Sequence, residues 1–108
     1  MKRGSFVLAA SPSDYGKPRP ALIVQSDLFS ALPSITICPL TSDLRDDVPL
    51  LRLTVLPTAA NGLRLPSQIA IDKMTTLPLQ RFSDIIGRAD DALMVDVTRA
   101  LALFLGVS

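Results

Sequence analysis

The sequence predicts a small, mainly β domain in which a strongly bent sheet or barrel packs against one C-terminal α-helix. Short apolar segments follow each other at close spacing and are separated by turns rich in Pro, Gly, Ser and Asp. Near the C-terminus the apolar residues change to helical spacing. Because the chain has 108 residues and contains no linker or repeat, residues 1–108 are expected to form a single domain.

The first half of the chain contains three expected strands. Ser5 to Ala10 is short and apolar. Pro20 to Gln25 is apolar on both faces, which predicts a central strand, and a strand tolerates proline at its first position. Ser26 is expected to cap a single helical turn. Ile35 to Cys38 is the third expected strand, and Pro39 interrupts it.

The second half is expected to add three more strands. Leu50 to Val55 alternates apolar and polar residues. Asn61-Gly62 is a strong turn signal, and Arg64 to Ile71 after it predicts a strand with a kink at its proline. Asp84 to Arg88 is expected to form a short last strand.

The closing helix is expected to start after the candidate caps Asp90 and Asp91 and to stop at Gly106. Its apolar stripe comprises Leu93, Val97, Ala100, Leu101 and Phe104. This stripe is typical of a face that packs on a core or a partner, not of a cofactor site.

Composition excludes several kinds of chemistry. The chain has no His, which excludes imidazole catalysis and His-ligated metals, and its single cysteine, Cys38, cannot form an intramolecular disulfide. All ten acidic residues are Asp, and the net charge is only +1. No cofactor or metal is therefore expected. The absence of disulfides indicates the cytoplasm, and no apolar run approaches the ~20 residues that cross a membrane.

Arg19 is the first candidate functional residue. It lies in Lys17-Pro18-Arg19-Pro20, where the prolines hold Lys17 and Arg19 extended at the start of a buried strand. A guanidinium on such a rigid base can bind an anion through a fork of hydrogen bonds. The alternative is a surface arginine that pairs with an aspartate.

Two further patterns carry polar side chains. Thr41 and Ser42 follow the third strand, where adjacent hydroxyls can bind a ligand oxygen or cap the loop at Asp43. Pro66 to Lys73 alternates polar and apolar residues along one strand, so Gln68 and Asp72, four residues apart, are expected on one face. An amide and a carboxylate on a sheet face can read nucleobase edges, although a solvent-facing strand surface is the alternative.

The order of these motifs resembles the MazF/PemK family of toxins from bacterial toxin–antitoxin pairs. The resemblance rests on Lys17 to Asp27, on Cys38-Pro39-Leu40-Thr41-Ser42, on Leu65 to Lys73, and on the closing helix. It implies an SH3-like barrel (CcdB/MazF-like) with a C-terminal α-helix, acting as a homodimer. A cognate antitoxin protein is the implied protein partner.

The resemblance also implies a metal-independent endoribonuclease that cuts single-stranded RNA at short sequences and inhibits translation and growth. Arg19 and Thr41 match the family's catalytic arginine and threonine. The residues expected to contact RNA are Asp14, Tyr15, Lys17, Ser42, Gln68, Asp72 and Lys73. Family members often carry a Glu just before the arginine, whereas here the nearest acid is Asp14.

The RNA's own 2′-hydroxyl is the expected nucleophile, and the products are a 2′,3′-cyclic phosphate and a 5′-hydroxyl. Arg19 would stabilise the extra charge on the phosphorane, which is usually the largest contribution to catalysis. Asp14, Asp72, water or Arg19 itself remain open as the proton acceptor. Two other functions also remain open: a CcdB-like gyrase poison, against which the absence of Trp argues, and a non-catalytic SH3-like interaction module.

Overall fold

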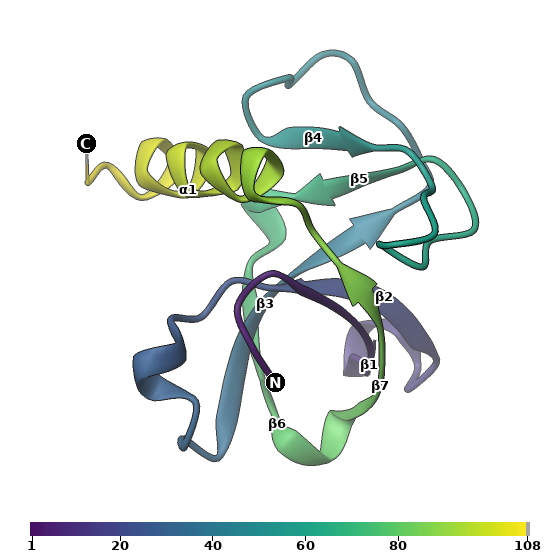
Figure 1. Cartoon of the computed structure of the whole chain (residues 1–108), viewed down its shortest axis with the longest axis vertical. Helices are drawn as coiled ribbons and strands as arrows, with labels where there is room; N and C mark the ends of the chain where they lie inside the picture. The colour runs from purple at the N-terminus through teal and green to yellow at the C-terminus, as the bar shows by residue number, and fades with distance from the viewer. Residues whose placement is uncertain (108) are drawn as a thin grey trace.

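The computed structural model describes residues 1–107, so that Ser108, the last residue of the expected domain, lies outside the described residues. One antiparallel sheet dominates the structure, in the order β4-β5-β3-β2-β1-β7, with β6 also paired to β3 (Figure 1). Its strands are β1 (Ser5–Ala10), β2 (Pro18–Ile23), β3 (Ser34–Thr41), β4 (Arg52–Val55), β5 (Ser67–Ala70), β6 (Thr75–Pro78) and β7 (Phe82–Arg88). The predicted bent sheet with one C-terminal helix is confirmed.

Four single-turn 3₁₀ helices and one α-helix complete the described part of the chain. The 3₁₀ helices are η1 (Pro12–Asp14), η2 (Asp27–Phe29), η3 (Ile71–Lys73) and η4 (Leu79–Arg81), and the α-helix is α1 (Asp91–Leu105). Ser26 caps η2, and Asp90 and Gly106 cap the two ends of α1, as the sequence predicts. Within residues 1–107, no helix has the length and apolar character needed to cross a membrane.

The core lies on both faces of the central strands. Along β2, Leu22 is buried against one cluster and Ile23 against another, because successive side chains of a strand point to opposite faces. This confirms the prediction that this strand is central. The first cluster includes Val97 of α1. Helix α1 lies beside β4 and β5 in Figure 1. Cys38 belongs to the same cluster and is fully buried, as a core residue should be.

The third strand is longer than predicted. β3 continues through Pro39 to Thr41, so the expectation that Pro39 interrupts it is wrong. Pro39 lies where β3 changes neighbours, because β6 pairs with β3 up to Ile37 and β5 pairs with it from Leu40. A proline is tolerated at such a break, since its missing N–H removes no ladder bond there. The extra length carries Thr41 to the strand's very end.

The region after β4 differs most from the sequence prediction. The strand expected from Arg64 to Ile71 is shorter, and β6 was not predicted at all. Ile37 and Leu40 are three residues apart along β3. Their partners, Thr75 on β6 and Ile69 on β5, are six residues apart in sequence. The three extra residues form η3, which separates β5 from β6.

Candidate functional site

A groove of about 1270 Å³ opens at the ends of β2 and β3, and the segment 62–65 also lines it. Five of the nine predicted site residues line this groove: Asp14, Arg19, Thr41, Ser42 and Lys73. Buried side chains such as Ala21 and Ile37 lie among its lining residues, so the groove is hollowed into the folded core of the sheet. The remaining four predicted residues, Tyr15, Lys17, Gln68 and Asp72, are not among the lining residues.

Arg19 and Thr41 occupy corresponding positions on neighbouring strands. β2 and β3 pair from Ile23 opposite Ile37 to Ala21 opposite Pro39. Arg19 lies two residues before Ala21 on β2, and Thr41 lies two residues after Pro39 on β3. Because side chains alternate along a strand, each of the two shares a face with the last paired residue of its strand. Both side chains therefore enter the same groove from adjacent strand ends.

The charge of Arg19 is only loosely paired. Its Nε lies 3.7 Å from Oδ1 of Asp14, and the two side chains are 53% and 36% exposed. The aspartate partner that the sequence left open is thus present. Such an exposed pair contributes little to stability, so an incoming anion can replace the carboxylate at modest cost.

Thr41 both caps a loop and faces the groove. Its Oγ1 accepts a hydrogen bond of 3.1 Å from the backbone N–H of Asp43, which is the capping role considered from the sequence. A hydroxyl that accepts in this way still has its own proton to donate. Capping therefore holds the Thr41 hydroxyl in place without using the proton that a ligand oxygen would accept.

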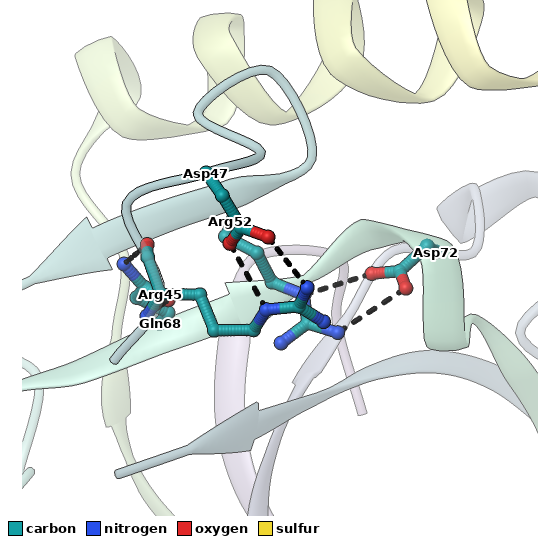
Figure 2. A network of polar contacts seen from close by, with 5 residues as sticks. All are labelled: Arg45, Asp47, Arg52, Gln68 and Asp72. Atoms are coloured by element: carbon teal, nitrogen blue, oxygen red, sulfur yellow. Dashed lines mark hydrogen bonds and ion pairs between the residues drawn. The ribbon is translucent and has the colours of Figure 1, made fainter. Parts of the chain in front are cut away.

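Gln68 lies opposite Thr41 on the paired strand β5 and is 5% exposed. Its Oε1 accepts from the backbone N–H of Arg45 at 2.9 Å, and its Nε2 donates to the Arg45 carbonyl at 2.8 Å. The same Nε2 also donates to Oγ1 of Thr54 at 3.2 Å. Figure 2 shows Gln68 against the Arg45 segment. The protein itself therefore uses both ends of this amide.

Asp72 does not share a strand face with Gln68, so that prediction is wrong. β5 ends at Ala70, and Asp72 lies in η3, which the sequence pattern did not reveal. Its two carboxylate oxygens accept from Nε and Nη2 of Arg52 at 2.9 and 3.2 Å (Figure 2). The hydrogen bond from Arg52 holds the pKa of Asp72 below its usual value. Lys73, the next residue, is exposed and lines the groove.

Tyr15 and Lys17 belong to the loop that carries Asp14. Tyr15 ends η1 in a left-handed conformation, with φ of 57°, and its side chain is completely exposed. Lys17 donates its backbone N–H to the carbonyl of Asp14 at 3.0 Å. These two residues lie beside the groove rather than in its lining.

The charged residues of the groove lining are mostly cationic: Arg19, Arg52, Arg64 and Lys73, with Asp14 as the acidic member. Arg52 is neutralised by Asp72, which leaves three cations facing one carboxylate. Arg64 is a lining residue that was not predicted from the sequence. The Asn61-Gly62 turn before it was recognised, but which wall this turn faces depends on long-range packing. A cationic groove of this kind suits a polyanion such as a nucleic-acid strand.

The chain is also similar to known proteins. Residues 2–105 match the model of a family described as PemK-like, MazF-like toxin of type II toxin-antitoxin system. The chain is 44% identical over 109 residues to a protein of Mycolicibacterium smegmatis named probable endoribonuclease MazF. The match covers 100% of this chain and 99% of that protein.

Solved structures share the fold. Mycobacterium tuberculosis toxin MazF-mt6 has a TM-score of 0.82 and 23% identity, and the match covers 96% of this chain and 98% of that one. A mycobacterial endoribonuclease in complex with its cognate antitoxin has a TM-score of 0.83 and 21% identity, covering 100% and 97%. A MazE-MazF structure from Deinococcus radiodurans has a TM-score of 0.77 and 22% identity, covering 100% and 98%. The family match and the 44% relative both span nearly the whole chain, and so the chain belongs to the PemK-like, MazF-like toxin family of type II toxin–antitoxin systems.

Proposed function

We propose that this chain is a sequence-specific, metal-independent endoribonuclease toxin that cleaves single-stranded RNA, including mRNA, and thereby inhibits translation and growth. The observation that carries the proposal is the position of Arg19 and Thr41 on adjacent strand ends at one groove. Family membership and the 44% identical relative support the same activity.

The proposed reaction starts with the RNA 2′-oxygen, which attacks the adjacent phosphorus while its proton is removed. The bond to the 5′-oxygen of the next nucleotide then breaks, and that oxygen takes up a proton. The products are a 2′,3′-cyclic phosphate and a 5′-hydroxyl. Arg19 stabilises the extra negative charge on the phosphorane, and Thr41 donates a hydrogen bond to a non-bridging or leaving oxygen.

Asp14 is the proposed proton acceptor. Of the two aspartates considered from the sequence, Asp14 lines the groove and lies 3.7 Å from Arg19. Asp72 is held by two hydrogen bonds to Arg52, and its lowered pKa makes it a weaker base. A proton-transfer group in position typically contributes about 10²–10⁴ in rate.

Other predicted residues have supporting roles in this proposal. Ser42 and Lys73 contact RNA inside the groove, and Tyr15 and Lys17 contact it at the rim. Gln68 supports the groove by holding the Arg45 loop, and Asp72 supports it by holding Arg52, which lines the groove.

The proposed partners are single-stranded RNA, a cognate antitoxin and a second copy of the chain, and the proposed place of action is the cytoplasm, where mRNA is translated. A homodimer is supported by the exposed apolar side chains at the end of α1, Leu103, Phe104 and Leu105. In Figure 1 this end of the helix extends beyond the sheet. The mycobacterial and Deinococcus neighbours that contain an antitoxin support the second partner.

The test is incubation of the purified protein with a mixed pool of single-stranded RNA in EDTA, followed by sequencing of the new ends. Cleavage at a short sequence, with 2′,3′-cyclic phosphate and 5′-hydroxyl ends, is expected. Arg19→Ala and Thr41→Ala should each lower the rate by about 10²–10³, as for loss of a transition-state hydrogen bond. Arg99→Ala, on the exposed side of α1, is the control and should cleave like the wild type. Intact RNA, or undiminished cleavage by Arg19→Ala, contradicts the proposal.

A further inference from the structure

We propose that residues 56–66, called here the wall loop, form a preformed wall of the groove, and that Arg64 on this loop binds a backbone phosphate of the RNA. This inference rests on the proposed function. Arg64 comes from a different part of the chain from Arg19 on β2 and Thr41 on β3, yet all three line the same groove. In this proposal, the phosphate that Arg64 binds is a different one from the phosphate that is cleaved.

The wall loop is held together from inside by Asn61, which is 5% exposed. Its Oδ1 accepts from the backbone N–H groups of Thr58 and Leu63, each at 3.0 Å, and its Nδ2 donates to the carbonyl of Leu56 at 2.9 Å. The N–H of Asn61 donates to Oγ1 of Thr58 at 3.0 Å. A loop with so many internal hydrogen bonds has few other conformations available, so it does not need RNA to order it.

Close backbone contact fixes the wall loop to β7. A Cβ added at Gly62 would lie 1.9 Å from the carbonyl oxygen of Ile86, and one added at Gly87 would lie 2.2 Å from the carbonyl carbon of Asn61. Arg88 adds a hydrogen bond of 2.9 Å from its N–H to the carbonyl of Ala60. The position of Arg64 relative to the sheet is consequently set by the fold.

The charge of Arg64 is unpaired within the described residues 1–107. The ion pairs of that part of the chain join Arg19 to Asp14, Arg45 to Asp47, and Arg52 to Asp72. Arg64 is exposed and lines the groove without such a carboxylate. A guanidinium on a rigid support, with no competing acid, loses little on binding a phosphate and gains hydrogen bonds to a charged group.

The experiment compares Arg64→Gln with Arg81→Gln, a matched control in η4 whose side chain is exposed but does not line the groove. The ligand is a short RNA that contains a wild-type cleavage site, with a 2′-deoxy nucleotide at that site so that it cannot react. Binding is measured between 50 and 300 mM salt, roughly the range in which phosphate contacts change affinity strongly.

Arg64→Gln is expected to bind about fivefold more weakly, as for one exposed charge pair, and its log Kd against log salt slope should fall by about 0.7. Arg64→Lys should recover the slope because it keeps the charge, and Arg81→Gln should match the wild type. The turnover number of Arg64→Gln on uncut RNA should stay within about twofold of the wild-type value, because Arg64 binds RNA without touching the reacting atoms.

Wild-type affinity and salt slope in Arg64→Gln, with cleavage by the wild type intact, would overturn this inference and leave the proposed function standing. A fall in turnover as large as that of Arg19→Ala would also overturn it, since Arg64 would then act at the reacting phosphate. Failure of the wild type to bind or cleave any RNA would overturn both proposals together.

Discussion

The side-chain amide of Gln68 holds the backbone of Arg45 through two hydrogen bonds, one accepted from its N–H at 2.9 Å and one donated to its C=O at 2.8 Å. These bonds fasten the loop that follows Thr41 to the strand paired with Thr41. The Gln68 side chain thus satisfies the backbone N–H and C=O of Arg45, as a neighbouring strand would do. The relationship predicts how the fold responds when this amide is changed.

Gln68→Glu is expected to destabilise the protein at neutral pH and to recover as the pH falls. A carboxylate cannot donate to the Arg45 carbonyl, whereas a protonated carboxyl has both the donor and the acceptor that Arg45 needs. Burial raises the pKa of such a carboxyl above its unfolded value, so the protonated form contributes stability at low pH that is lost as the pH rises. The deficit relative to wild type should be about 1–3 kcal/mol at pH 7.5 and smaller at pH 5.

Urea unfolding of both proteins across this pH range provides the measurement. Gln68→Leu is the matched control, because it loses the same hydrogen bonds but has no group to protonate. Its deficit should therefore stay constant between pH 7.5 and pH 5. A constant deficit in Gln68→Glu as well would show that the two Arg45 hydrogen bonds do not depend on a donor at position 68.

The pair Arg52 and Asp72 predicts a loss of stability in acid. The side chain of Arg52 is 7% exposed and that of Asp72 is 29% exposed, and the hydrogen bond from Arg52 lowers the pKa of Asp72 in the folded state. A lowered folded pKa means that the pair's contribution is complete above the unfolded value of about 3.9 and is lost as the pH falls below it. Stability should therefore drop as the pH falls below about 4.

Asp72→Ala at pH 7 should cost about 3 kcal/mol, because it leaves the Arg52 guanidinium buried without a partner. The double variant Arg52→Met/Asp72→Leu should be closer to wild type at pH 7 and should lack this part of the acid dependence. Urea unfolding at pH 7, 4 and 2.5 tests both statements. If Asp72→Ala is as stable as the double variant, the buried charge is not what makes the single change costly.

Cys38 is expected to be unreactive in the folded protein. Burial is the main cause that raises its pKa to about 12, and the charge of Asp72 adds to the effect. Since the thiolate is the reactive form, an aromatic disulfide reagent at pH 8 should label the native protein only as fast as it opens, and label it at once in 8 M urea. Complete labelling within seconds under native conditions would contradict this.

The sequence predicted those elements whose signals are local. Ser26 and Asp90 have cap chemistry in their own side chains, and Gly106 adopts a left-handed conformation at the helix end. The first strand matches its predicted bounds, Ser5 to Ala10, because a single short apolar run fixes both of its ends. Local patterns marked Arg19 and Thr41 only as candidates, each beside a proline-containing segment. Their catalytic roles came from the family resemblance and stay predictions.

The wrong predictions concern residues whose structure depends on pairing between strands far apart in the sequence. Pro39 reads locally as a strand break, but β3 passes through it because its neighbours change there. The local pattern predicts Asp72 on the same face as Gln68. In the structure, however, η3 separates β5 from β6, which pairs with β3, and Asp72 lies in η3. Arg64 faces the groove because the wall loop packs against β7, through contacts between residues more than 20 positions apart in sequence, such as Gly62 and Ile86.

Gly62 and Gly87 yield the last prediction. Each lies where an added Cβ would meet backbone, Ile86 in one case and Asn61 in the other, so alanine at either position must push the wall loop away from β7. Gly62→Ala and Gly87→Ala should each cost about 1–3 kcal/mol by overpacking. Because both act on one contact, the double variant should cost less than the two single costs added together.

Urea unfolding of the three variants measures this coupling. Gly16→Ala is the control, because its φ of +75° is similarly left-handed but an added Cβ meets nothing within 4 Å. It should therefore cost only the backbone strain, about 1 kcal/mol. If Gly62→Ala costs no more than Gly16→Ala, the contact with Ile86 yields easily, and the wall loop is not fixed to β7. If it costs more, and RNA affinity falls with it, the backbone contact is what holds Arg64 at the groove.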